Sequence, residues 1–160
     1  MSEPPYQYEY PRPAVAVDVI IVRVNYDGSR EMLLIERGNE PFKGLWALPG
    51  GFLEENETLA EGAARELKEE TGVEVSGDDL TQLEAYSQVD RDPRTRVISV
   101  IYFALLESNV VVKAGDDAAN AEWYCPDELP ELAFDHDKIV SDWDSMIRSW
   151  DGDTQTGHEH

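Results

Sequence analysis

The sequence predicts an α+β fold, a mixed α/β/α sandwich in which helices cover a β-sheet. Expected strands, a helix, further strands and a last helix follow one another along the chain. The 160 residues suffice for one domain, and 41% of them are hydrophobic, which is typical of a folded chain. We expect an extended arm at residues 1–13, the domain over residues 14–150 and a disordered tail at residues 151–160.

The first part of the domain is expected to form a β-hairpin and a loop. Residues 14–24 alternate β-branched side chains, a pattern that predicts a strand. The turn signal at residues 25–28 predicts a hairpin whose returning strand covers residues 32–35. Residues 38–51 are rich in glycine and proline and are expected to form a loop.

A helix is expected over residues 58–71. Thr58 begins this segment and Glu61 follows three residues later, which is the spacing of a capping box. Gly72 stands where a glycine commonly follows the last helical turn. Local signals therefore predict both ends of this helix.

Three strands and a final helix are expected after residue 72. Residues 80–89 and 97–106 are predicted strands around a tight turn, and a short strand is expected at residues 122–124. The last helix is predicted over residues 136–150, because its apolar side chains repeat along one face.

The net charge excludes several classes of partner. The chain carries 34 Asp and Glu against 13 Lys and Arg, which gives a net charge of −21 at pH 7. Because so acidic a surface repels polyanions, binding to nucleic acid or to an anionic membrane is disfavoured. A phosphate-bearing substrate would need a local basic patch or metal cations.

Cysteine usage and targeting signals predict a reduced, cytoplasmic protein with no membrane partner. Cys125 is the single cysteine, which excludes an intrachain disulfide and a zinc site built from cysteines. Residues 1–10 lack the basic and apolar regions of a signal peptide. The longest apolar run, residues 97–106, has about half the length that a membrane-spanning helix needs.

Three glutamates gather on one edge of the predicted helix. Glu66 and Glu70 lie one turn apart beside the apolar stripe, and Glu69 lies next to them. Like charges at this spacing destabilise a helix slightly, and a divalent cation would reverse that penalty. Carboxylate oxygens are ligands that Mg²⁺ and Mn²⁺ prefer. The alternative interpretation is a solvated acidic helix face.

The residues around these glutamates favour a metal site. Gly50 and Gly51 form part of a tight turn before the helix, where the lack of a side chain lets backbone carbonyls approach an ion. Arg65 precedes Glu69 by one turn and is placed to pair with it. Glu57 stands at the helix start, where a carboxylate interacts favourably with the helix dipole.

Together these residues resemble the complete sequence motif of the Nudix hydrolase family. The match fixes nine positions within 23 residues: Gly51, Glu57, Arg65, Glu66, Leu67, Glu69, Glu70, Gly72 and Val73. The resemblance implies an α/β/α sandwich with a mixed β-sheet, in which the motif forms a loop, a helix and a loop. It also implies Mg²⁺-dependent hydrolysis of a nucleoside diphosphate linked to another moiety.

The same resemblance implies roles for individual residues. Glu66 and Glu70 would be the principal ligands of Mg²⁺, with Mn²⁺ as the alternative ion. Glu69 would be a third ligand and the Gly50 carbonyl a further one. The remaining motif residues would support the site: Gly51, Glu57, Arg65 and Gly72.

Hydrolysis also needs a base that takes a proton from the attacking water. Glu69 itself is one candidate. The family often supplies this group from a later loop, and Asp117 is our preferred candidate there. Glu122 is the fallback, and a plain acidic loop is the alternative interpretation.

Arg91, Arg94 and Arg96 place three of the thirteen basic residues within six positions. Arginine binds phosphate through paired hydrogen bonds, so these three are the candidate substrate-binding residues. An ordinary charged hairpin turn is the alternative. This stretch and the segment at residues 133–137 resemble the ADP-ribose pyrophosphatase branch of the family. His136, in that segment, either contacts the substrate or serves the start of the last helix.

The leading hypothesis is hydrolysis of ADP-ribose to AMP and ribose 5-phosphate. Other nucleotide sugars, dinucleotides and oxidised nucleotides are alternative substrates. A non-catalytic ADP-ribose sensor is a further alternative, since some relatives are regulators with an added DNA-binding domain. The intact metal motif and the roughly ten residues after the last predicted helix disfavour it. The resemblance also suggests a homodimer.

Overall fold

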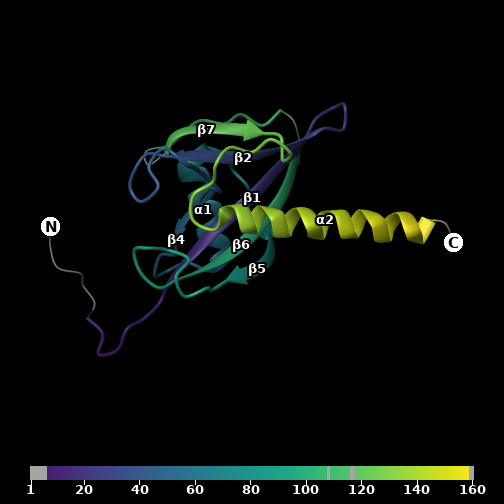
Figure 1. Cartoon of the computed structure of the whole chain (residues 1–160). Coiled ribbons are helices and arrows are strands. Elements are labelled where there is room, and N and C mark those ends of the chain that lie inside the picture. The colour runs from purple at the N-terminus through teal and green to yellow at the C-terminus, as the bar shows by residue number, and fades with distance from the viewer. Residues whose placement is uncertain (1–6, 108, 116–117, 159–160) are drawn as a thin grey trace.

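The computed structural model describes residues 7–107, 109–115 and 118–158, except for the side chains of residues 151–158. Within these residues the chain forms seven strands and two α-helices (Figure 1). The strands are β1 (Ala14–Val24), β2 (Arg30–Arg37), β3 (Trp46–Ala47), β4 (Gly50–Phe52), β5 (Thr81–Tyr86), β6 (Val97–Glu107) and β7 (Ala118–Tyr124). The helices are α1 (Leu59–Thr71) and α2 (His136–His158), with a 3₁₀ turn at Gly77–Asp79.

The strands form one mixed sheet with β1 at its centre. The main path runs β3-β2-β1-β6-β5, while β4 pairs with β1 and β7 pairs with β2. Strands β1 and β6 run parallel, from Ala14 opposite Val97 to Val24 opposite Glu107. The other strand pairs are antiparallel. The mixed sheet that the sequence predicts is therefore confirmed.

The two helices cover opposite faces of the sheet, because side chains alternate along β1. Val17, Val19 and Ile21 pack in one core cluster with Leu67 of α1. Ile20 and Val22 belong to a second cluster, which they share with the buried residues of α2: Ile139, Val140 and Trp143. Figure 1 shows α2 crossing in front of the sheet. The sandwich architecture is thus confirmed.

Two predictions about secondary structure were incomplete. The expected loop over residues 38–51 contains β3 and the start of β4, which are too short to produce a periodic signal. The backbone of α2 continues to His158, beyond the predicted end at residue 150. The sequence did not predict this extension because the polar residues after Trp150 show no apolar periodicity.

Residues 7–13 form neither helix nor strand and are exposed, while residues 1–6 of the expected arm lie outside the described residues. None of the described helices has the length and apolar character to cross a membrane.

Candidate active site

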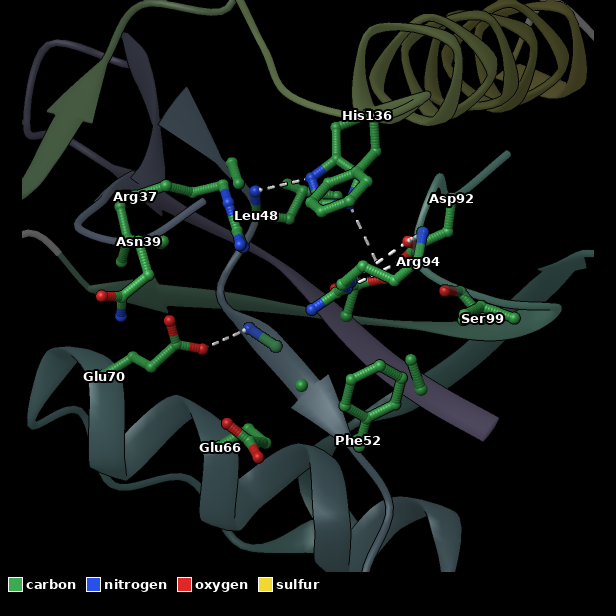
Figure 2. Close-up of a pocket in the computed structure, with 18 of the residues that line it drawn as sticks. Arg37, Asn39, Leu48, Phe52, Glu66, Glu70, Asp92, Arg94, Ser99 and His136 are labelled. Carbon is green, nitrogen blue, oxygen red and sulfur yellow. Dashed lines mark hydrogen bonds and ion pairs between the residues drawn. The ribbon is translucent and has the colours of Figure 1, made fainter. Parts of the chain in front are cut away.

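A cavity of about 430 Å³ opens between β4, α1 and the loop that leads into α2 (Figure 2). Its walls carry opposite charges. Glu66 and Glu70 project into it from α1, whereas Arg37 and Arg94 face it from the other side (Figure 2). Such a cavity can accommodate a ligand that is itself anionic and also binds cations.

Helix α1 presents its glutamates through well-defined ends. The Oγ1 of Thr58 accepts a hydrogen bond from the Glu61 amide at 3.2 Å, and the Glu61 carboxylate accepts one from the Thr58 amide at 3.0 Å. Gly72 ends the helix in the left-handed conformation, at φ 74°. Both predicted caps are confirmed. Glu66 and Glu70 consequently lie one turn apart on the face that lines the cavity.

Two glycines let β4 lie close against α1 and β1. The amide of Gly50 donates to Glu70 Oε1 at 2.7 Å, which fixes that carboxylate at the cavity. A Cβ at Gly50 would collide with the side chain of Asp18 on β1. A Cβ at Gly51 would lie 2.6 Å from the carboxyl carbon of Glu66. Carboxylates therefore lie directly against both glycines, together with the Val17 carbonyl at Gly50.

Arg65 organises the carboxylates on the neighbouring edge of α1. Its Nε and Nη2 bind the two oxygens of Glu57 at 2.8 and 2.7 Å. Its Nη1 binds Glu66 at 2.9 Å and Glu69 at 3.1 Å. The hydrogen bonds from Arg65 hold the pKa of Glu57 below its usual value, whereas burial raises the pKa of Glu66. The guanidinium thus offsets part of the repulsion among these glutamates.

The residues present fit a divalent cation bound together with a phosphate group. Glu66 and Glu70 supply hard carboxylate oxygens at the cavity, and the lack of a side chain at Gly51 allows the Glu66 carboxylate to lie against β4. Mg²⁺ commonly takes one or two carboxylates and completes its shell with water and substrate oxygens. Within the described residues, no group of three acidic, histidine or cysteine side chains could hold a metal without such help. Glu69 is turned to Arg65 and does not line the cavity.

The three predicted arginines lie in different environments. Arg91 is buried at the cavity wall, where it forms a bidentate ion pair with Asp135 at 2.9 and 2.7 Å. The Nη1 of Arg91 donates a hydrogen bond to the Ser99 hydroxyl at 2.6 Å. Arg96 does not line the cavity and, among the described residues, hydrogen-bonds to the carbonyl of Gln88 alone, at 3.5 Å.

Arg94 is the arginine of this loop that is open to a ligand. Its side chain is 40% exposed and lines the cavity. It binds Asp92 through Nε and Nη2, at 3.1 and 2.8 Å. Its guanidinium lies 4.9 Å from the ring centre of Phe52 and 5.3 Å from that of Phe134. The Arg94 guanidinium, which can donate hydrogen bonds to a phosphate, therefore lies beside two flat apolar rings.

Arg37, at the end of β2, is a cavity residue that the sequence did not single out. Its Nε donates to the Pro41 carbonyl at 2.7 Å, and its guanidinium lies 4.9 Å from the Phe134 ring centre. Among the described residues, no carboxylate pairs with it within 4.0 Å. Burial, and then the nearby charge of Arg94, lower its pKa. Two adjacent guanidinium groups favour an anion in this part of the cavity.

His136 is the first residue of α2 and is buried at the cavity wall. Its Nδ1 accepts a hydrogen bond from the Leu48 amide at 3.0 Å, and its Nε2 lies 3.9 Å from Asp18 Oδ2. Burial lowers the pKa of His136 and raises that of Asp18. Two roles were expected for His136, contact with the substrate or support of the start of α2. These contacts support a structural role beside the cavity.

The sequence comparison decides the family to which these residues belong. The model of the family described as the NUDIX domain matches residues 12–143. The chain belongs to the Nudix family. The residues in the cavity, Glu66, Glu70 and Gly51, are positions of the Nudix motif.

This Nudix domain is similar to proteins whose names refer to ADP-ribose. The ADP-ribose pyrophosphatase of Methanocaldococcus jannaschii is 51% identical over 134 residues, 84% of this chain and 75% of that protein. The ADPR responsive transcriptional repressor NtrR of Acinetobacter baylyi is 36% identical over 136 residues. That match covers 82% of this chain and 53% of the repressor, so the chain spans about half of its length.

A solved Nudix structure has the same fold. The NUDIX domain of Shewanella oneidensis NrtR, complexed with ADP ribose, is 28% identical with a TM-score of 0.80. The match covers 89% of this chain and 94% of that domain. The α+β Nudix fold is therefore confirmed.

Neither Glu69 nor Glu122, two of the three candidate bases, lines the cavity. Asp117 is outside the described residues. Glu122 is exposed on β7 and does not line the cavity. Gly115, two residues before Asp117, donates its amide to the Glu70 carbonyl at 2.9 Å. The chain therefore reaches the C-terminal end of α1 just before Asp117.

Proposed function

We propose that this protein hydrolyses ADP-ribose to AMP and ribose 5-phosphate in the cavity between α1 and the wall that carries Arg37, Arg91 and Arg94, called the arginine wall below. The observation that carries the proposal is the opposition of charges across that cavity, with glutamates on one side and arginines on the other. A pyrophosphate bound together with a divalent cation needs carboxylates for the cation and guanidinium groups for its own oxygens, and this cavity carries both. The name of the Methanocaldococcus jannaschii relative and the ligand named for the Shewanella oneidensis structure support this choice of substrate.

Each wall has its own task in this proposal. Glu66 and Glu70, together with the Gly50 carbonyl, would hold Mg²⁺ or Mn²⁺, while Arg65 orients Glu66 and the Gly50 amide orients Glu70. A divalent cation supplies neutralisation of phosphate charge and activation of water. Arg94 donates to the phosphate oxygens from the opposite wall.

Other parts of the mechanism and assembly stay predictions. These include Glu69 as a third metal ligand or as the base, and Asp117 as the preferred base. They also include Arg91 and Arg96 as phosphate donors. The homodimer and the cytoplasmic location also stay predictions. Arg91 is already bound to Asp135 and Ser99, so a direct contact with phosphate would require it to exchange partners.

The substrate is tested by incubating the protein with Mg²⁺ and a panel of nucleotide conjugates. We expect AMP and ribose 5-phosphate from ADP-ribose, with slower turnover of other nucleotide sugars, dinucleotides and oxidised nucleotides. Binding of ADP-ribose without turnover of any compound would indicate a sensor instead. Rapid turnover of an oxidised nucleoside triphosphate, with none of ADP-ribose, would contradict the choice of substrate.

Replacing Arg94 with alanine tests the arginine wall. A charge-assisted hydrogen bond contributes about 1.5–3 kcal/mol, so KM for ADP-ribose should rise roughly tenfold or more. The value of kcat should fall less, because Arg94 lies across the cavity from the carboxylates. Steady-state kinetics measure both constants. Arg148→Ala, which removes an exposed arginine of α2, is the matched control. An unchanged KM for Arg94→Ala would remove this residue from the binding site.

A further inference from the structure

Residues 48–50, which lead from β3 into β4 and are called the strip below, are held by three different parts of the fold. The Leu48 amide donates to His136 Nδ1 of α2 at 3.0 Å. The Pro49 carbonyl accepts from the Val19 amide of β1 at 2.8 Å. The Gly50 amide donates to Glu70 Oε1 of α1 at 2.7 Å. This strip therefore connects α2 and the sheet to a carboxylate of the cavity.

We propose that His136 is a positioning residue, which fixes the strip so that Gly50 orients Glu70 for cation binding. The inference rests on the proposed function, since it concerns the same cavity. His136 acts through the backbone of Leu48 and, two residues later, that of Gly50. The Val19 amide of β1 and the Glu70 carboxylate of α1 hold the strip from the other sides, so the imidazole is its anchor on the α2 side.

The surroundings of His136 keep its ring in place. The ring is buried, with 4% of the residue exposed, and Nε2 faces the Asp18 carboxylate at 3.9 Å. Because Nδ1 accepts the Leu48 hydrogen bond, the ring proton lies on Nε2, on the side of Asp18. The ring of Phe134 packs against it, with centroids 5.6 Å apart. Because these contacts restrict rotation of the imidazole, its hydrogen bond can fix the position of the Leu48 amide.

The same anchor is tied to the arginine wall. Asp135, which directly precedes His136, forms the bidentate ion pair with Arg91. Arg91 also binds Ser99 on β6, next to the loop that carries Arg94. The start of α2 thus joins the wall expected to bind phosphate to the strip expected to bind the cation. In this arrangement Arg91 acts on the site through Asp135 and His136.

Removing the acceptor at position 136 should loosen the strip. The Leu48 amide would lose its partner in a buried place, and Gly50 would no longer hold Glu70 in one orientation. Removal of a residue that orients a metal ligand typically costs about 10–100-fold in metal affinity or activity. We expect this loss in kcat and in Mg²⁺ affinity, with little change in KM for ADP-ribose.

Three variants at position 136 separate positioning from simple support of the fold. In His136→Asn, the side-chain oxygen lies close to the place of Nδ1 and can accept the Leu48 amide. His136→Phe keeps the ring but has no acceptor. His136→Gln places its amide further out, near the position of Nε2, and serves as the second variant if the Phe variant does not fold. Leu80→Ala is the control, because Leu80 is buried in the core cluster on the other face of the sheet, which contains none of residues 48–50.

The readouts are kcat, KM, Mg²⁺ affinity by calorimetry without substrate, hydrogen exchange of the Leu48 amide, and Tm. His136→Asn should keep Mg²⁺ affinity and kcat within about threefold of the natural protein, while the Phe or Gln variant loses about 10–100-fold in both. Exchange at Leu48 should quicken in the Phe and Gln variants alone. Leu80→Ala should lower Tm and leave the other readouts unchanged.

Two outcomes would overturn the proposal. The first is an equal loss in all three variants that follows their Tm, which would make His136 a structural residue only. The second is unchanged Mg²⁺ affinity when the Leu48 amide is released. Calorimetry and exchange do not use turnover, so a failure of the proposed substrate would be recognised separately from a failure of this positioning role.

Discussion

Replacing Glu70 with glutamine is expected to slow ADP-ribose hydrolysis by roughly a hundred- to a thousandfold, the size of effect typical of removing one preorganised charge-stabilising group. Glu70 lines the cavity and its carboxylate is fixed by the Gly50 amide. The substitution keeps the size of the side chain and an oxygen that can accept that hydrogen bond. It removes the negative charge that a divalent cation requires. Steady-state kinetics at several Mg²⁺ concentrations measure the loss.

The fold of this variant should survive. A hydrogen bond to a charged group and one to a neutral group differ by about 1–2 kcal/mol, and the loss of repulsion from Glu66 offsets part of that. Glu107→Gln, the same change at an exposed position at the end of β6, is the control and should leave kcat unchanged. A Glu70→Gln enzyme with near-normal kcat and Mg²⁺ affinity would remove Glu70 from the proposed metal site.

The sequence predicted best those features that depend on neighbouring residues. The helix expected over residues 58–71 is found at Leu59–Thr71, because both caps lie within a few residues of its ends. The parallel pairing of β1 with β6 has no such local signal. It joins segments about eighty residues apart, and alternation alone cannot say which strands become neighbours. The mixed character of the sheet was predicted, but its order was not.

The same contrast applies to the cavity. Glu66 and Glu70 were predicted because one helix holds both, and the spacing within a helix is fixed. Arg37 was missed because it is an isolated arginine at the end of a strand, brought to the cavity by the sheet. Composition drew attention to Arg91, yet its burial against Asp135 depends on two segments 44 residues apart. Charge clustering in a sequence therefore indicates a site without indicating which of its members are open to a ligand.

Replacing Gly115 with alanine is expected to lower the free energy of unfolding by about 2–4 kcal/mol, through overpacking and a lost hydrogen bond. A Cβ at this position would overlap the backbone carbonyl of Glu69. That carbonyl belongs to α1 and cannot move without breaking the helix. The chain must instead leave α1, so the hydrogen bond from the Gly115 amide to the Glu70 carbonyl is lost. Thermal or denaturant unfolding measures the change.

Gly28→Ala is the matched control for this substitution. Gly28 has a positive φ of 87°, and within the described part of the chain no heavy atom beyond its two sequence neighbours lies within 4 Å of an added Cβ. Alanine there therefore costs about 1–2 kcal/mol of backbone strain alone. Gly115→Ala should exceed that loss and should also reduce kcat, because Asp117, the preferred candidate base, follows two residues later. Asp117→Asn should then lower kcat with little change in stability. If Gly115→Ala destabilises the fold while kcat stays normal, the base must come from elsewhere, and Glu69 on α1 becomes the leading candidate.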